Sequence, residues 1–113
     1  MSNQHDEWLL RTAGWERTSD GDDPEFVFWS HADQSAKPDG WYNTPDALTH
    51  PITDRALRHY LFTKGPVLTW YRKDFSVVNV ELRGWSIIGS GDTENEALRA
   101  ACIAYALATG EIE

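Results

Sequence analysis

The sequence contains one cysteine and one methionine among its 113 residues. A single cysteine, Cys102, cannot close a disulfide within the chain, which excludes an internally disulfide-bonded fold. Its neighbours Ala101, Ile103 and Tyr105 predict a small buried hydrophobic side chain. The sequence places no base beside this thiol to activate it, so thiol chemistry is disfavoured.

Long apolar runs are also absent. No segment approaches the roughly 18 to 20 apolar residues that a membrane span requires, and the polar start MSNQHDEW lacks the basic-then-apolar order of a signal peptide. A hydrophobic content of 41% in 113 residues suffices for one core and is too little for two ordinary domains. We therefore expect a single cytosolic domain that spans residues 1–113.

Familiar catalytic and cofactor-binding motifs are missing as well. GxSxG, the P-loop and GxGxxG do not occur. The histidines have neither an i,i+4 pairing on one helix nor the Cys/His spacing of a zinc site. Residues 89–91, Gly-Ser-Gly, precede a predicted helix and could offer amides to an anion, but the absence of a following lysine favours a plain tight turn. We expect no metal and no organic cofactor.

One group of polar residues keeps an enzymatic alternative open. His50, Asp54 and His59, with Asp46 nearby, would form a small metal-dependent or acid/base site if the loop and the helix that carry them converge. The sequence does not establish that convergence. We therefore retain the enzyme as the alternative to a binding protein.

Basic residues are scarce in the first half of the chain. Residues 1–54 hold 11 acidic side chains against Arg11, Arg17 and Lys37, whereas residues 55–113 hold 7 acidic and 7 basic side chains. The net charge of -8 therefore belongs to the first half. An acidic surface repels phosphate backbones and attracts basic proteins, so we expect a protein partner with a basic surface rather than direct binding to nucleic acid. The alternative is that the charge only maintains solubility.

The clearest local signals define a helix over residues 93–109. Thr93 and Glu96 form a capping box, and Gly110 suits the left-handed residue after a helix. An alanine stripe at helical spacing predicts close packing of this helix on a sheet. Its members are Ala97, Ala101, Ala104 and Ala108.

Two further helices are predicted at residues 6–13 and 53–64. Asp6 and Thr53 are the expected N-caps, and Gly14 ends the first of these helices. Alternating apolar residues predict a hairpin and then three sequential antiparallel strands. The expected strands cover residues 15–18 and 25–29, and then 67–73, 75–82 and 85–88, with a long irregular acidic and aromatic connection at 30–52. The pattern indicates an α+β fold, a single-domain layered sandwich with a mostly antiparallel sheet.

The end of the chain also resembles a known family. The Gly84-Trp85 strand start, the turn at residues 90–93 and the alanine helix that begins with Glu96-Ala97 are similar to the phage ABA sandwich domain, a small phage and prophage protein. Looser similarities are Leu9-Leu10, Gly14-Trp15, the stretch from Trp29 to Pro38-Asp39-Gly40, and His50 to Asp54. The resemblance implies a layered fold and a viral protein of the bacterial cytoplasm. It brings no catalytic residues.

Six tryptophans are many for a chain of this length. We expect some of Trp29, Trp41 and Trp70 to be partly exposed, although an aromatic-rich core would equally account for them. Exposed aromatic rings beside acidic residues are typical of protein-binding sites. The predicted partner-binding residues are Asp20, Asp22, Asp23, Glu25, Trp29, Asp33, Asp39 and Trp41.

The resulting functional prediction is a small acidic phage-type accessory protein. It would bind, and thereby inhibit, a bacterial antiviral complex of the CRISPR-Cas kind by covering its nucleic-acid-binding surface. The sequence excludes neither a homo-oligomer nor a monomer.

Overall fold

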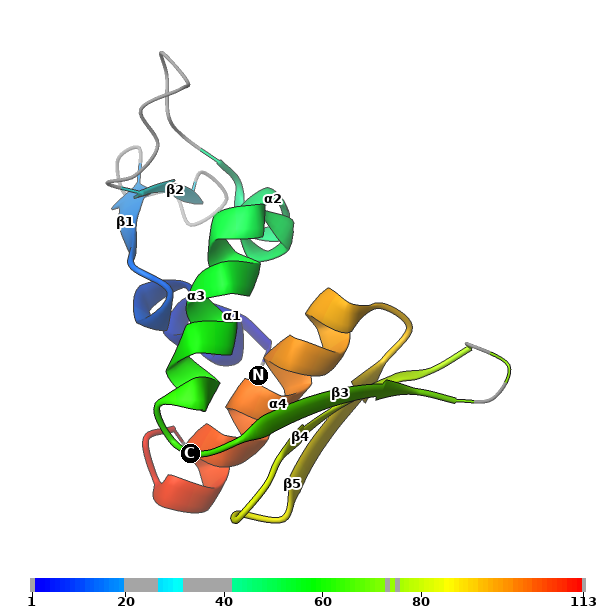
Figure 1. Ribbon diagram of the computed structural model, residues 1–113. Coiled ribbons are helices and arrows are strands. Elements are labelled where there is room, and N and C mark those ends of the chain that lie inside the picture. The colour runs from blue at the N-terminus through cyan, green and yellow to red at the C-terminus, as the bar shows by residue number, and fades with distance from the viewer. Residues whose placement is uncertain (1, 20–26, 32–41, 73, 75, 113) are drawn as a thin grey trace. The chain divides into compact units, whose positions relative to one another are not determined.

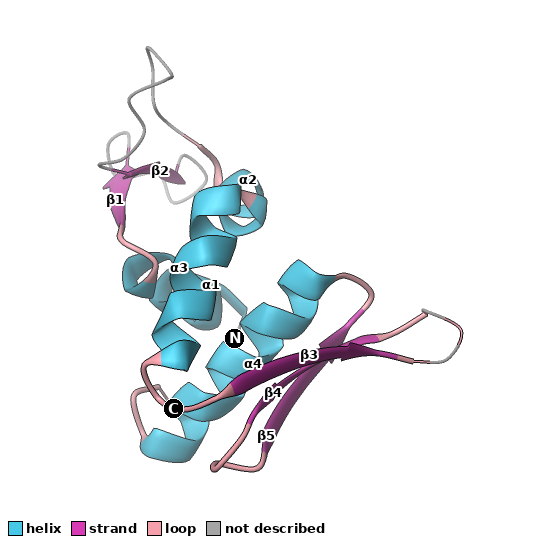
Figure 2. Cartoon of the chain, viewed as in Figure 1, coloured by secondary structure: helices cyan, strands magenta, loops and turns pink. Residues whose placement is uncertain are grey.

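The computed structural model describes residues 2–19, 27–31, 42–72, 74 and 76–112 (Figure 1). The described residues form four helices and two small antiparallel sheets, which confirms the predicted α+β class (Figure 2). In chain order the elements are α1 Ser2–Thr12, β1 Trp15–Ser19, β2 Val27–His31, α2 Thr44–Thr49, α3 Pro51–Phe62, β3 Val67–Tyr71, β4 Val78–Leu82, β5 Ile87–Gly91 and α4 Glu94–Thr109.

The chain divides into two compact units, Met1–Ala56 and Leu57–Glu113, and helix α3 continues through the boundary. Each unit has its own small sheet, β1–β2 in the first and β3–β4–β5 in the second. The prediction of one domain over residues 1–113 stays a prediction. None of the helices in the described ranges is long and apolar enough to cross a lipid bilayer.

In the first unit, α1 leads into the β1–β2 hairpin through Gly14, whose φ of 95° provides the left-handed conformation predicted for it. The predicted N-cap at Asp6 is wrong, because the helix already begins at Ser2 and includes Asp6. An i,i+4 ion pair supports the exposed side of this helix, with Arg11 Nη2 2.8 Å from Glu7 Oε1.

Helix α2 lies within the segment 30–52 that the sequence predicted to be irregular, and this part of the prediction is wrong. Asn43 caps the helix by accepting a hydrogen bond from the Asp46 amide, and a proline occupies its first turn. The start of α3 also differs from the prediction, because the helix begins two residues earlier than expected. Helix α3 begins at Pro51, so the predicted N-cap Thr53 lies inside it and is buried.

The second unit is a three-stranded sheet with α4 packed on one of its faces (Figure 1). Strand β4 is central, and its inward side chains Val78, Val80 and Leu82 are buried. The alternation along β4 therefore assigns one sheet face to the core. This face contacts α4 through β4 and β5.

The predicted Gly-Ser-Gly turn is instead part of strand β5, and the predicted strand 85–88 begins two residues later, at Ile87. The physical reason is close helix–strand contact. A Cβ atom added to Gly89 would lie 2.1 Å from the Ala101 backbone nitrogen, and one added to Gly91 would lie 2.6 Å from Glu96 Cβ. Glycine in this strand therefore marks the approach of another backbone rather than a turn.

Helix α4 has the predicted caps. Thr93 accepts a hydrogen bond from the Glu96 amide, and Gly110 has a φ of 80°. The predicted orientation of the helix is partly wrong, because Ala108 is exposed and Ala104 only half-buried. Cys102 and Tyr105 contact α3, whereas Ala97 and Ala101 face the sheet. The buried side of α4 is therefore turned around the helix axis relative to the alanine stripe. Its members are Ala97, Leu98, Ala101, Cys102, Tyr105 and Ala106.

Candidate interaction surfaces

Most of the predicted acidic site lies outside the described residues. Of its eight members only one, Trp29, falls within the ranges that the structure covers. The other seven are Asp20, Asp22, Asp23, Glu25, Asp33, Asp39 and Trp41. Their role stays a prediction that rests on the charge of the sequence.

The expectation that Trp29 is an exposed anchor is wrong. Trp29 is only 2% exposed. Its indole Nε1 donates a hydrogen bond to Thr44 Oγ1 at 2.9 Å, and its backbone pairs with that of Tyr42. An indole can be buried when its N–H finds an acceptor, and Thr44 at the start of α2 supplies one. Trp29 therefore connects the β1–β2 hairpin to α2.

His50 occupies the junction between α2 and α3. Its Nδ1 accepts a hydrogen bond from the Ile52 amide at 3.1 Å. Its ring stands edge-to-face against Trp15 and Tyr42, with centroid distances of 5.7 and 5.1 Å. These contacts give His50 a structural role at the start of α3.

Thr53 completes this junction. Its Oγ1 accepts a hydrogen bond from Trp15 Nε1 at 2.7 Å and donates one to the Ala47 carbonyl at 2.5 Å. The hydroxyl therefore satisfies a buried indole N–H and a carbonyl of α2 at once. Sequence reasoning missed this role because Trp15 and Thr53 are 38 residues apart.

The structure places the residues of the enzymatic alternative on α2, on α3 and at the junction between them. Asp46 is exposed in the first turn of α2, and His59 is exposed on α3. Asp54 and His59 are five residues apart on α3, which places them roughly 140° apart around the helix. Across the part of the chain that the structure describes, no three His, Cys, Asp or Glu side chains are placed to hold a metal ion.

The glycine-rich segment before α4 does not offer a free anion site either. The carboxylate of Glu96 accepts a hydrogen bond from the Asp92 amide at 3.0 Å. An acidic side chain of the helix itself therefore occupies the position that an anion would take. Glu94 adds a second negative charge to the same first turn.

The outer face of the second sheet exposes three large apolar side chains. Side chains on this face alternate with those that point toward α4. Leu68, Trp70 and Ile88 are 43%, 44% and 49% exposed. We call this surface the open face, and it comprises Leu68, Trp70, Asn79, Glu81, Ile88 and Ser90.

The register arranges the open face in two rows across the strands. Leu68, Glu81 and Ile88 form one row. Trp70, Asn79 and Ser90 form the next. Exposure of Trp70 was expected. Exposure of Leu68 and Ile88 was not expected. The alternation of side chains along strands 67–71 and 87–91 would have indicated it.

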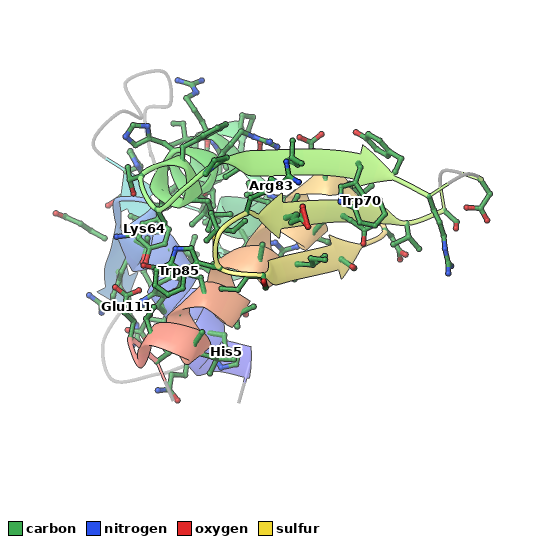
Figure 3. The ribbon with its side chains drawn as sticks, turned by 60° about the horizontal axis from the view of Figure 1, so that its bottom comes forward. His5, Lys64, Trp70, Arg83, Trp85 and Glu111 are labelled. Carbon is green, nitrogen blue, oxygen red and sulfur yellow. The ribbon has the colours of Figure 1, made fainter. Side chains whose placement is uncertain are left out.

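A second exposed aromatic group surrounds the β4–β5 turn (Figure 3). Trp85, predicted as a strand residue, lies in this turn and is 46% exposed. Its ring packs edge-to-face on Tyr105 at 5.0 Å, and its Nε1 donates to the Lys64 carbonyl at 3.3 Å. The Lys64 ammonium lies 5.1 Å from the ring centre of Tyr60, within the range of a cation–π contact. This cluster is a contact between chain segments of one unit.

The same cluster holds a half-buried tyrosine. Tyr60 Oη donates a hydrogen bond to Glu111 Oε2 at 2.6 Å. Burial, together with this acceptor carboxylate, raises the pKa of Tyr60 above its ordinary value. The hydrogen bond of this phenol ties α3 to the segment after α4.

A third network joins α3, β3 and α4 within the second unit. Arg58 pairs with Glu94 through its guanidinium and also donates to Thr69 Oγ1 at 3.3 Å. The Tyr71 hydroxyl donates to Glu94 Oε2 at 3.4 Å. Because Arg58 binds both neighbours, we assign it a positioning role rather than a free cationic site.

A scan against protein-family models found no match, and searches of curated proteins and of solved structures found no similar protein. The resemblance to the phage ABA sandwich domain therefore stays a prediction from sequence motifs. Function has to be argued from the charge and the surfaces of this chain.

Proposed function

We propose that the protein is a small binding protein whose acidic first half docks on the basic surface of a nucleic-acid-binding protein. In the setting that the sequence motifs suggest, it is a phage-type inhibitor in the bacterial cytoplasm, and its target is an antiviral complex of the CRISPR-Cas kind. The observation that carries this proposal is the confinement of the net charge of -8 to residues 1–54.

The distribution of the charge supports binding over simple solubility. Solubility requires only net charge, which would serve equally well if it were spread over the whole chain. Six acidic residues instead fall between positions 20 and 39, against the single base Lys37. Such a concentration of one sign raises the rate of encounter with a basic surface and excludes phosphate backbones.

The experiment compares two triple variants that remove the same charge. The test variant carries Asp20→Asn, Asp22→Asn and Asp23→Asn. The control carries Asp74→Asn, Asp92→Asn and Glu113→Gln in the second half. A partner is first isolated from bacterial lysate with the wild-type chain, and its association is then measured by interferometry at low and physiological salt.

We expect the test variant to associate several times more slowly at low salt and to show a weaker salt dependence, because long-range attraction acts on the association rate. The control should associate like the wild type. Equal rates for all three proteins at low salt would refute the proposal and leave solubility as the role of the acidic residues.

A further inference from the structure

We propose that the open face of the β3–β4–β5 sheet binds the same face of a second copy of this chain. The surface differs from the acidic segment, and the inference does not rest on the proposed function. It starts from the three large apolar side chains of the open face, Leu68, Trp70 and Ile88, each more than two-fifths exposed. An antiparallel sheet that meets water normally presents polar side chains there.

Two polar residues of the open face, Asn79 and Ser90, hydrogen-bond to each other. Ser90 Oγ donates a hydrogen bond to Asn79 Oδ1 at 2.7 Å, and Asn79 is buried between Trp70 and Ser90 in the register. Covering this row therefore sacrifices few hydrogen bonds to water. This row can be desolvated at low cost, as a docking surface requires, whereas Glu81 needs a partner when it is covered.

The charges of this region are self-complementary. Glu81 lies at the centre of the open face. Arg83 lies two residues later in the sequence, and its Nε is 3.8 Å from Glu81 Oε2. Arg83 stands at the end of the sheet opposite Trp70 (Figure 3), because its amide bonds to the Pro66 carbonyl before β3. In a two-fold arrangement, residue i of one copy meets residue j of the other and the reverse. Each Glu81 would then face the other copy's Arg83.

The neutrality of this half selects a second copy over a charged partner. Residues 55–113 carry 7 acidic and 7 basic side chains, so a basic protein or a nucleic acid gains little attraction here. A second copy presents the same apolar side chains and both signs of charge. The small extent of the face, five residues on each of three strands, indicates a weak dimer.

The experiment follows the mass of the full chain by sedimentation equilibrium at concentrations between about 1 µM and about 1 mM. We expect a reversible monomer–dimer equilibrium within this range. Trp70→Ala should weaken dimerisation by about tenfold or more, because a large exposed tryptophan is the expected anchor. Leu107→Ala is the control, since Leu107 is similarly exposed at 47% but lies on α4, which packs on the opposite face of the sheet.

Charge variants test the pairing itself. Glu81→Arg makes positions 81 and 83 both basic, and Arg83→Glu makes them both acidic, so each variant alone should dimerise less than the wild type. An equimolar mixture should recover association, because the two variants complement each other across the two-fold axis.

Circular dichroism verifies that each variant is folded. If Trp70→Ala unfolds, Ile88→Ser replaces it with the same expected loss. A chain that stays monomeric at the highest concentration overturns the inference. So does a dimer that Trp70→Ala leaves intact, or a charge-variant mixture that associates no better than its components.

Discussion

Gly89 has no room for even one additional carbon. Its Cβ would lie 2.1 Å from the Ala101 nitrogen and 2.3 Å from the Ala97 carbonyl oxygen, and backbone atoms of a helix cannot move aside singly. Gly84 differs, since its φ of 89° needs glycine but its surroundings are open. A comparison of substitutions at the two glycines therefore distinguishes the cost of a steric clash from the cost of backbone strain.

We expect Gly89→Ala to destabilise the protein by about 3 kcal/mol or more, because α4 must move away from the sheet. Gly84→Ala should cost only about 1 to 2 kcal/mol, the strain of a left-handed alanine. Urea denaturation of the two variants gives both values. A smaller loss for Gly89→Ala than for Gly84→Ala would contradict the close helix–strand contact.

The pKa of Cys102 is shifted by burial alone, so its effect on stability follows from one cause. It is fully buried in α4, and burial raises the pKa of the Cys102 thiol from 9.0 to about 12. The unfolded chain therefore releases this proton at a lower pH than the folded chain. Stability from the neutral thiol is complete below pH 9 and is lost as the pH rises toward the folded pKa.

We expect this group to make the free energy of unfolding about 1.4 kcal/mol smaller at pH 10 than at pH 8. Cys102→Ala should lose that component of the pH dependence, whatever its stability at pH 8. Urea denaturation at the two pH values measures the difference. The prediction fails if wild type and Cys102→Ala show the same pH dependence.

At the scale of elements, α4 was predicted far better than the connection before α3. Thr93, Glu96 and Gly110 act within one helical turn of the helix ends, so the sequence alone specifies them. The face that α4 buries depends on α3 and β5 together, and helical periodicity alone misplaced it. Capping residues are close in the sequence to the helix ends that they stabilise, whereas the residues that pack on a helix are distant in the sequence.

The candidate sites follow the same rule. The number of tryptophans predicted that some of Trp29, Trp41 and Trp70 are exposed, but the burial of Trp29 depends on Thr44, 15 residues away. Gly89 resembled a turn residue because the helix that requires it comes later in the chain. Sequence reasoning therefore identified the charge asymmetry well and the aromatic surfaces only in part.

A pair of alanine variants tests the revised orientation of α4. Ala101 is fully buried and Ala108 is exposed, although both belong to the predicted stripe. Ala101→Leu should overpack the contact with the sheet and cost about 1 to 3 kcal/mol. Ala108→Leu should change stability by less than about 0.5 kcal/mol. Equal melting temperatures for the two variants would contradict the burial of Ala101 and the exposure of Ala108.

At the scale of the whole molecule, the two proposed interactions respond to salt in opposite directions. Each copy carries a net charge of -8, so two copies repel each other at long range. Binding of a basic partner is instead driven by that charge. Raising the ionic strength from about 0.01 M to about 0.15 M shortens the screening length from about 30 Å to about 8 Å.

We therefore expect dimerisation to strengthen over this range and binding of the basic partner to weaken. Sedimentation equilibrium and interferometry on the same preparation measure both. Parallel responses to salt would show that at least one surface has been assigned to the wrong kind of partner.

The order β3–β4–β5–α4 also bears on how quickly the second unit assembles. Its strands are joined by short connections, and α4 follows β5 after only two residues, so contacting segments are close neighbours along the chain. Little chain entropy is lost in closing such loops, so we expect this unit to assemble faster than a sheet of the same size with long connections. The Gly89–Ala101 contact lies within this segment, which makes β4, β5 and α4 the expected folding nucleus.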